Sequence, residues 1–397
     1  MSLNDTPSGE RVNIAFFGLR NAGKSSLVNS VTGQDLAVVS DVKGTTTDPV
    51  KKAMELLPLG PVVIIDTPGL DDEGELGELR VKKAKQVLGM CDVAVLVTDS
   101  RNDLTKTELD LIRSFEERNL KFVIARNKSD LLAKIPDNDS RNIYVSALTG
   151  ANVNLLKDRL ASLAKNSGQE KFLVRDLLSA GDFVILVIPI DKAAPKGRLI
   201  LPQQQTIRDI LDARCSCLLC QDTELEKIFG LLSVKPKLVI TDSQVFEKVS
   251  EIVPEDILLT SFSILFARYK GDLRVLVNGA KKLENLRDGD RVLISEGCTH
   301  HRQCGDIGTE KMPSWIRKFS GANPEFAFTS GGDFPDENDL RKYALIVHCG
   351  GCMLNEQEMR TRLERASRAG VSIVNYGIAI ANMHGILKRS LEPFKNF

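Results

Sequence analysis

The sequence predicts an α/β protein with three successive parts, each built around a largely parallel sheet. Near the N-terminus, an apolar run at 11–17 passes through a glycine-containing loop into a helical segment. Between residues 183 and 269, short apolar runs alternate with helical segments. Later, the apolar runs 291–294 and 343–347 each end beside cysteine and histidine residues. Such alternation is typical of parallel sheets covered by helices, with functional sites at the carboxyl ends of the strands.

The composition is that of an ordinary globular protein with several domains. The 397 residues exceed what one hydrophobic core organises, and 42% of them are hydrophobic and 27% charged. Lys and Arg together number 53, as do Asp and Glu, so the formal net charge is zero. Because nucleic-acid-binding proteins usually carry a basic excess, we expect no nucleic-acid partner. The polar first ten residues and the short apolar runs predict a cytoplasmic protein with no membrane segment.

The first part contains a phosphate-binding loop in the strand–loop–helix context that such loops require. Residues 18–25 read Gly-Leu-Arg-Asn-Ala-Gly-Lys-Ser. Backbone N–H groups of this kind of loop surround phosphates, and the start of the helix adds positive potential. Lys24 is expected to reach the β- and γ-phosphates of a nucleotide, and Ser25 to bind Mg²⁺. The residues expected to contact the nucleotide here are Gly18, Asn21, Ala22, Gly23, Lys24, Ser25 and Ser26.

Three further segments predict that the nucleotide is GTP or GDP. Residues 66–69 read Asp-Thr-Pro-Gly, in which Asp66 is expected to hold Mg²⁺ through water and the Gly69 N–H to sense the γ-phosphate. Residues 127–130 read Asn-Lys-Ser-Asp, and a buried Asp130 carboxylate would accept two N–H donors that adenine lacks. The remaining base contacts are expected from Asn127, Lys128, Ser146 and Ala147. Over residues 1–165 these segments resemble the TrmE/Era-like small GTPases.

The sequence predicts the mechanism of GTP hydrolysis less directly than it predicts nucleotide binding. Residues 44–48 read Gly-Thr-Thr-Thr-Asp, and by similarity to GTPases with Gly-Thr-Thr-Arg-Asp we expect Thr46 to bind Mg²⁺ and the γ-phosphate. Leu70 stands where many GTPases have a water-orienting glutamine. Asn21 together with the threonine loop resembles the potassium-activated GTPases, although a turn-stabilising role is the alternative. We expect slow hydrolysis that K⁺ stimulates, carried by Lys24, Thr46, Asp66 and Gly69.

The middle of the chain alternates strands and helices without a nucleotide-binding motif. Residues 166–175 are expected to form a linker, followed by an α/β domain at 176–270 and a last domain at 271–397. Strands are expected at 183–190 and 238–241, among others. Cysteines at 215, 217 and 220 are interpreted as core residues, because buried cysteine packs as a small apolar side chain. A second metal site is the alternative.

Two clusters of potential metal ligands lie in the last domain. Residues 298–301 read Cys-Thr-His-His, and residues 348–352 read His-Cys-Gly-Gly-Cys. Each cluster follows a predicted strand. Three cysteines and a histidine suit a tetrahedral structural zinc ion. Three cysteines with an open fourth position suit an iron–sulfur cluster equally well, so the spacing leaves both open.

The whole pattern resembles the HydF family of [FeFe]-hydrogenase maturation GTPases. That resemblance implies a P-loop GTPase fold followed by two further α/β domains with largely parallel sheets, the first of which forms a homodimer. It implies a [4Fe-4S] cluster on Cys298, Cys349 and Cys352. It also implies a carrier that receives a CO- and CN⁻-bearing diiron precursor from radical-SAM maturases and delivers it to apo-[FeFe]-hydrogenase. For the fourth ligand we select His300; water, His301, Asp306 and His348 are the alternatives. The competing function is a tRNA-modification or ribosome-assembly GTPase with a structural zinc domain.

Overall fold

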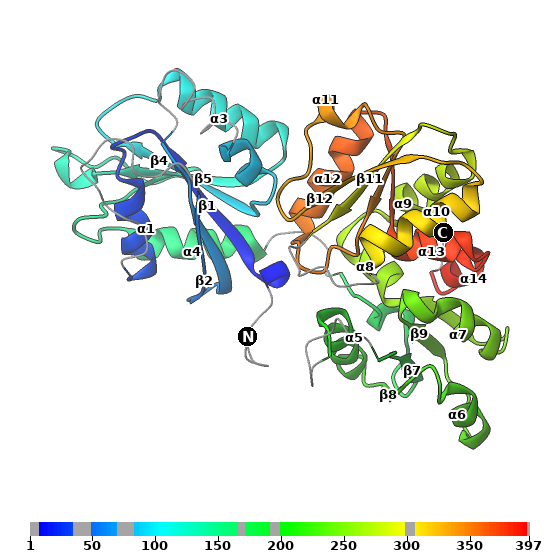
Figure 1. Cartoon of the computed structure of the whole chain (residues 1–397). Helices are drawn as coiled ribbons and strands as arrows, with labels where there is room; N and C mark the ends of the chain where they lie inside the picture. Colours follow the sequence, from blue (N-terminus) through cyan, green and yellow to red (C-terminus); the bar gives the residue numbers. More distant parts are fainter. Residues whose placement is uncertain are drawn as a thin grey trace. The chain divides into compact units, whose positions relative to one another are not determined.

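The computed structural model describes residues 8–34, 49–69, 83–165, 171–190, 199–297 and 306–394. The chain divides into two compact units, Met1–Gln169 and Glu170–Phe397 (Figure 1). Several residues discussed for the sites lie outside the described ranges, and His301, an alternative fourth ligand, is one of them. They also include Thr46, Leu70, Cys298 and His300.

The first unit is a sheet covered by helices. Its elements are η1 (Ser8–Glu10), β1 (Val12–Gly18), α1 (Lys24–Thr32), β2 (Val50–Leu56), β3 (Gly60–Asp66), β4 (Val93–Asp99), α3 (Lys106–Glu117), β5 (Lys121–Asn127), η2 (Ser129–Leu131), β6 (Asn142–Tyr144) and α4 (Val153–Lys165). Within the described residues the strand order is β2-β3-β1-β4-β5-β6, with β2 antiparallel to β3 and the other pairs parallel. The parallel arrangement brings the loops after β1, β3 and β5 to one edge of the sheet.

Apolar side chains cover both faces of this sheet. One hydrophobic cluster contains Leu27 of α1 and Leu156 of α4, packed against alternate residues of the strands. A second cluster, on the other residues of the strands, contains Val87 of the helical segment 83–88 and Phe115 of α3. Because both faces are buried, β1 and β4 are apolar along nearly their whole length rather than alternating with polar residues.

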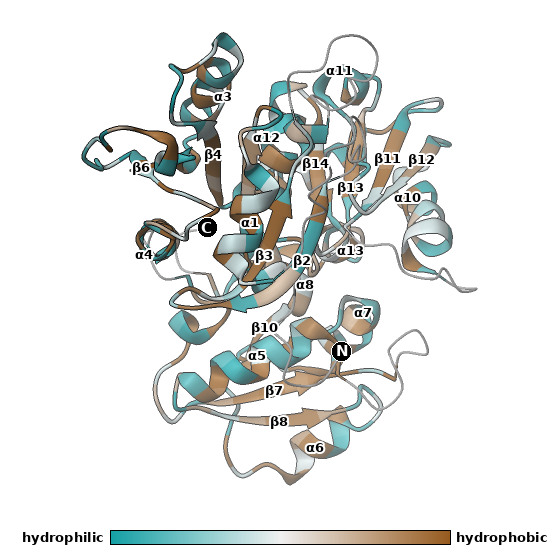
Figure 2. Cartoon of the chain, turned by 90° about the vertical axis from the view of Figure 1, so that its left-hand side faces the viewer, coloured by the Kyte–Doolittle hydropathy of each residue, from teal (hydrophilic) through white to brown (hydrophobic). Residues whose placement is uncertain are grey.

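The second unit begins with a parallel sheet. Its elements are η3 (Arg175–Leu177), β7 (Phe183–Val187), α5 (Leu201–Asp212), β8 (Ser216–Cys220), α6 (Leu225–Leu231), β9 (Leu238–Thr241), η4 (Ser243–Val245), α7 (Phe246–Ile252), β10 (Leu258–Ser261) and α8 (Phe262–Lys270). The described strands lie in the order β10-β9-β7-β8, and all pairs are parallel. Hydropathy colouring shows the apolar strands, with β7 and β8 beside each other below α5 (Figure 2).

A second parallel sheet completes this unit. Its elements are α9 (Leu273–Ala280), η5 (Lys281–Asn285), β11 (Arg291–Glu296), the π-helix η6 (Ile307–Lys311), α10 (Met312–Ser320), β12 (Glu325–Ser330), α11 (Glu337–Leu340), β13 (Leu345–His348), α12 (Glu356–Arg368), β14 (Ser372–Asn375), α13 (Tyr376–Met383) and α14 (Leu387–Leu391). The described strands lie in the order β12-β11-β13-β14, again all parallel. β11 and β13 are therefore neighbours, so the loops that follow them lie at the same sheet edge.

The two sheets of the second unit share one hydrophobic core. Helix α8 packs against α9, α12 and α13 of the later part. A Cβ at Gly377 would lie 2.3 Å from Cβ of Ser263, so the start of α13 can approach α8 only with glycine there. The Asn375 side chain also donates to the Ser263 carbonyl at 2.9 Å.

Most strands lie where the sequence predicts them. The strands expected at 238–241 and 291–294 are confirmed as β9 and β11. The strand expected over 183–190 is shorter, ending at Val187. Leu173 and Val174, which the sequence analysis places in the linker, are buried in the core of the second unit. No helix in the described residues is both long and apolar enough to cross a bilayer.

Candidate functional site

Close packing explains the two glycines of the phosphate-binding loop. A Cβ at Gly18 would lie 2.3 Å from the Val97 carbonyl oxygen of β4. Gly23 adopts the left-handed conformation at φ 81°, and a Cβ there would lie 2.2 Å from Nδ2 of Asn127. Asn21 is also left-handed, at φ 58°, and its side chain is exposed. The loop therefore reaches its shape through contacts with β4 and with the last residue of β5.

The residues expected to bind Mg²⁺ lie together. Oγ of Ser25 donates to Oδ2 of Asp66 at 2.8 Å, and Nζ of Lys24 lies 3.7 Å from Oδ1 of Asp66. Oδ1 of Asp66 is buried and has no hydrogen-bond partner among the described residues. Burial raises the pKa of Asp66, and Lys24 opposes that rise. A buried carboxylate oxygen without a hydrogen-bond donor, beside a hydroxyl, fits a hard divalent cation.

Asn127 ties together the loops after three strands. Its Nδ2 donates to the carbonyl oxygen of Ala22 at 2.9 Å and more weakly to that of Gly23 at 3.4 Å. Its Oδ1 accepts from the N–H of Ala147 at 3.0 Å. With 2% exposure, Asn127 is a buried bridge between the phosphate loop and the predicted base loop.

The base-binding residues surround this bridge. Lys128 is left-handed at φ 62°, and its Nζ lies 2.9 Å from Oδ2 of Asp99 at the end of β4. Arg101 and then Lys128 hold the pKa of Asp99 well below its usual range. Asp130 is exposed in this structure, in contrast to the burial expected from the sequence. Oγ of Ser146, which is fully buried, accepts from the N–H of Thr149 and so shapes the loop.

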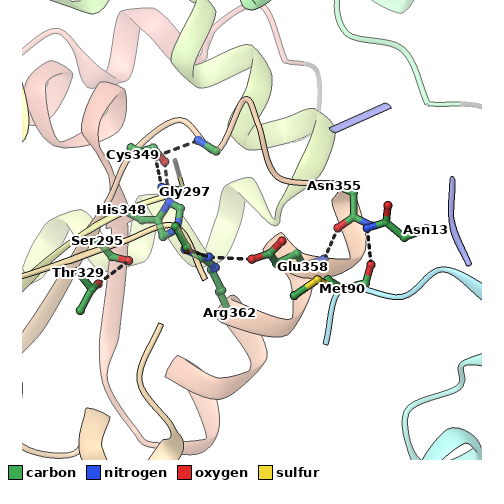
Figure 3. A network of polar contacts seen from close by, with 12 residues as sticks. Asn13, Met90, Ser295, Gly297, Thr329, His348, Cys349, Asn355, Glu358 and Arg362 are labelled. Carbon is green, nitrogen blue, oxygen red and sulfur yellow. Dashed lines mark hydrogen bonds and ion pairs between the residues drawn. The ribbon is translucent and has the colours of Figure 1, made fainter. Parts of the chain in front are cut away.

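The second candidate centre is the turn that follows β13. Sγ of Cys349 accepts from the N–H of Gly297 at 3.0 Å and from that of Gly351 at 3.4 Å (Figure 3). Gly351 is left-handed at φ 63°, which turns its N–H back toward the sulfur. Burial raises the pKa of the Cys349 thiol to about 11, and these two N–H groups oppose the rise. A metal's positive charge would stabilise the thiolate, which the N–H donors already favour.

Cys352 lies in the same turn, supported by a buried lysine. Nζ of Lys270, at the end of α8, donates to the carbonyl oxygens of Cys352 at 2.9 Å and Leu354 at 2.7 Å. Lys270 is only 3% exposed. Burial raises the pKa of the Cys352 thiol, and the Lys270 charge opposes that rise. Two thiols on one turn, with backbone donors and a buried cation nearby, fit two ligands of an anionic metal–thiolate group.

His348 does not have a ring nitrogen available for metal. Nδ1 lies 2.7 Å from the carbonyl oxygen of Cys349, and Nε2 lies 3.0 Å from Nη1 of Arg362. The carbonyl can only accept and the guanidinium can only donate, so Nδ1 carries the proton and Nε2 accepts. Burial, followed by the Arg362 charge, lowers the pKa of His348 to about 3. In this conformation both ring nitrogens of His348, one of the alternatives for the fourth ligand, are thus engaged by protein groups.

The remaining candidate ligands have other roles or fall outside the described ranges. Oδ2 of Asp306 accepts from the N–H and the hydroxyl of Thr309, both at 2.8 Å, and so caps η6. Cys215 and Cys220 are buried in the core, as predicted, whereas Cys217 is half-buried and packs against it. In the described ranges no three His, Cys, Asp or Glu residues gather into a metal-binding group. The third predicted cysteine, Cys298, lies outside those ranges, immediately after Gly297.

Sequence reasoning missed several residues that organise these sites. Asp99 ends an apolar strand, which is a signal that could have identified it. Lys270 is the last residue of the largely apolar helix α8, and Arg362 lies four residues after Glu358 on α12. The sequence shows where these charged residues lie along the chain, but it does not show which groups they contact.

Three family models match successive parts of the chain. The model described as 50S ribosome-binding GTPase matches residues 13–128. The hydrogen maturase F dimerization domain matches residues 173–271, and the hydrogen maturase F tetramerization domain matches residues 274–393.

Curated relatives match part of the chain. The tRNA modification GTPase MnmE of Nitrosomonas europaea is 32% identical over 164 residues, which is 40% of this chain and 35% of that protein. MnmE of Streptococcus pyogenes is 32% identical over 160 residues, covering 39% of this chain and 34% of the relative. The chain thus spans about a third of the length of these relatives. Among solved structures, the G domain of the T. maritima FeoB iron transporter is 26% identical with a TM-score of 0.31, covering 39% of this chain and 99% of that one.

Proposed function

The chain belongs to the hydrogen maturase F family, and from this premise we propose that it is a GTP-regulated carrier in the maturation of an [FeFe]-hydrogenase. Its N-terminal part is a P-loop GTPase domain, and α/β domains with mostly parallel sheets follow it. In the proposal the last domain binds a [4Fe-4S] cluster and carries a diiron precursor. Radical-SAM maturases supply the precursor, and the apo-hydrogenase receives it.

The observation that supports the proposal is the cysteine turn after β13. Two backbone N–H groups point at Sγ of Cys349, which is the usual environment of a cluster thiolate. Cys352 lies on the same turn, and Cys298 directly follows the residue whose N–H bonds to Cys349. Three thiolates would leave one iron with an exchangeable position, where a ligand of the diiron precursor can attach. His300 remains the proposed fourth ligand, held loosely enough to be displaced.

The nucleotide site is proposed to act as the control element. Ser25 and Asp66 would hold Mg²⁺, Lys24 would reach the β- and γ-phosphates, and Thr46 with the Gly69 N–H would respond to the γ-phosphate. The exposed Asp130 is free to accept from guanine when a nucleotide brings its edge near. Asn21, left-handed and exposed, is proposed to bind K⁺, which supplies positive charge at the phosphates.

Self-association is expected from the dimerization and tetramerization domains. We propose that strand β8 forms the homodimer contact. In the described chain β8 is an edge strand paired only with β7, and Leu219 on it is 43% exposed. An unprotected apolar edge strand is an unfavourable surface for a monomer, because its N–H and C=O groups can pair with another chain.

Metal analysis tests the carrier proposal. The chain is purified without oxygen, assayed for iron, sulfide and zinc, and examined by EPR after reduction. Roughly four irons and four sulfides per chain, with a signal lost in Cys349→Ser, are expected. Cys217→Ser, which changes a cysteine of β8 away from the turn, is the matched control and should keep the signal. Partner delivery is then measured as activation of apo-hydrogenase.

A second candidate function follows from the similarity of part of the chain to the tRNA modification GTPase MnmE. In that alternative the chain is a tRNA-modification or ribosome-assembly GTPase with a structural zinc site. About one zinc per chain and no sulfide after reconstitution would support it and exclude the cluster. RNA binding by the full chain would then be the next measurement.

A further inference from the structure

Arg362 is a buried arginine immediately behind the cysteine turn. It lies on α12 with 2% exposure, and its guanidinium contacts three groups (Figure 3). Nη1 faces Nε2 of His348 at 3.0 Å, and Nη2 donates to Oε1 of Glu358 at 2.8 Å and to the Gly331 carbonyl at 2.5 Å. Nε has no hydrogen-bond partner in the described ranges. Burying a guanidinium costs desolvation free energy, and the contacts to His348, Glu358 and Gly331 offset that cost.

The contacts form a chain that ends at a predicted metal ligand. The Asn355 side chain caps α12 by accepting from the N–H of Glu358, which fixes the first turn of the helix. Glu358 holds the Arg362 guanidinium one turn later. Arg362 in turn determines the tautomer of His348, whose Nδ1–H then donates to the carbonyl of Cys349. The Phe334 ring closes the space, with its centroid 6.3 Å from the His348 ring and 5.1 Å from the guanidinium carbon.

We propose that Arg362 is a positioning residue of the cysteine centre, acting through His348, and that His348 supports the Cys349 backbone instead of binding the metal. The carbonyl of Cys349 is fixed by His348 and its N–H by the Ser295 carbonyl at 2.9 Å. With both peptide groups held, Sγ stays directed toward the N–H groups of Gly297 and Gly351. The inference rests on the proposed function in one respect, which is that Cys349 binds a metal cluster.

The tautomer can be tested without any metal. The chain contains four histidines, so ring nitrogen NMR of the ¹⁵N-histidine-labelled apoprotein is tractable, and His348→Asn identifies the relevant signals. We expect a neutral ring with the proton on Nδ1 in the wild type, and loss of that single tautomer in Arg362→Met. A wild-type ring with its proton on Nε2, or an unchanged ring in Arg362→Met, would overturn the inference.

Two substitutions of His348 distinguish a residue that hydrogen-bonds to the Cys349 carbonyl from a residue that binds the metal. Asparagine places an N–H donor near the position of Nδ1, so it can still bond to the Cys349 carbonyl. Glutamine places an acceptor near the position of Nε2, so it can satisfy Arg362 but leaves that carbonyl without its donor. We therefore expect the asparagine variant to retain iron and sulfide better than the glutamine variant. Equal loss in both, together with disappearance of a nitrogen coupling from the pulsed EPR spectrum, would identify His348 as a ligand and refute the proposal.

Arg362 itself is tested against a matched arginine on the same helix. Arg360 pairs with Glu356 at the i,i+4 spacing, as Arg362 does with Glu358, but it is exposed. Arg362→Met is expected to weaken retention of the cluster against a chelator by about 10- to 100-fold, the usual range for a residue that supports a metal ligand. Arg360→Met should match the wild type. Arg362→Lys, which keeps the charge but loses the planar fork, covers the case in which the methionine variant does not fold.

The outcomes distinguish this inference from the proposed function. If the wild type takes up zinc and no sulfide, the carrier proposal fails, while the NMR result still decides whether Arg362 sets the tautomer. If the wild type binds iron and sulfide and folded Arg362→Met or Arg362→Lys protein retains them equally, the positioning role is refuted and the carrier proposal stands.

Discussion

Replacing Asn127 with alanine removes the side chain that connects the phosphate loop with the predicted base loop. The change deletes a 2.9 Å hydrogen bond to the Ala22 carbonyl, a 3.4 Å contact to Gly23 and a 3.0 Å bond from the Ala147 N–H. Losing the first bond leaves the buried Ala22 carbonyl without a donor, and losing the last leaves the half-buried Ala147 N–H without an acceptor. At about 1–3 kcal/mol for each group, and with some relaxation, the total is about 2–4 kcal/mol.

This free energy is expected to appear mainly in nucleotide binding, because bound nucleotide requires both loops to be in place. A loss of about 2–4 kcal/mol corresponds to a Kd for GDP that rises about 30- to 900-fold. Fluorescent-nucleotide titration measures that change, and thermal unfolding without nucleotide measures the part that falls on stability. Asn142→Ala is the control, since Asn142 lies on the adjacent strand β6, donates to the exposed Asp139 at 2.9 Å and accepts weakly from Nε of Arg126 at 3.5 Å.

Asn127→Asp makes the test more specific. It preserves the acceptor for the Ala147 N–H but turns a carboxylate oxygen toward the Ala22 carbonyl, so it should bind no better than the alanine variant. If Asn127→Ala bound GDP within threefold of the wild type, or if the aspartate variant bound normally, the bridge would not organise the site.

Other consequences can be measured separately. Gly23→Ala should impair nucleotide binding through a clash with Nδ2 of Asn127, and adding Asn127→Ala should relieve part of the defect, whereas strict additivity would rule out the clash. Lys24→Ala should abolish GTP turnover while iron and sulfide content stay normal, and loss of the cluster would reveal direct coupling between the sites. GTP hydrolysis should be faster in K⁺ than in Na⁺, and Asn21→Ala should remove the difference; equal wild-type rates would exclude this role. His348 has a lowered folded-state pKa, so its contribution to apoprotein stability is present above pH 6.5 and is lost as pH falls toward about 3. Between pH 7 and pH 5 this loss should be about 2 kcal/mol, and urea unfolding of His348→Asn should show a correspondingly smaller pH dependence.

The elements of the fold were largely predictable because their signals are local. Buried parallel strands are short apolar runs, and both β9 and β11 were identified in this way. The phosphate loop was predictable for a similar reason, since one short pattern specifies both its glycines and its lysine. The strand expected over 183–190 is longer than the observed β7, which ends at Val187. An apolar run predicts burial, but it does not show where hydrogen bonding to the neighbouring strands ends.

The arrangement of the sites was less predictable because it depends on contacts between distant residues. The sequence predicts that Asn127 contacts the nucleotide. In the structure its side-chain amide donates a hydrogen bond to the carbonyl of Ala22, which lies 105 residues earlier in the chain. His348 was considered a ligand because histidine beside cysteine commonly binds metal. The tautomer of His348 depends on its contact with Arg362. The spacing of residues along α12 does not predict that the Arg362 guanidinium faces the His348 ring.

The contacts of Lys270 make the two hydrogen maturase F domains of this chain depend on each other. The boundary between the two hydrogen maturase F domains falls at residues 271–274, immediately after this lysine. Yet its ammonium holds two carbonyls of the cysteine turn more than eighty residues later. A fragment that begins at the boundary would lose that support and would expose the helix faces that α8 covers. Exchange of one segment between relatives would therefore require a compatible change in the other.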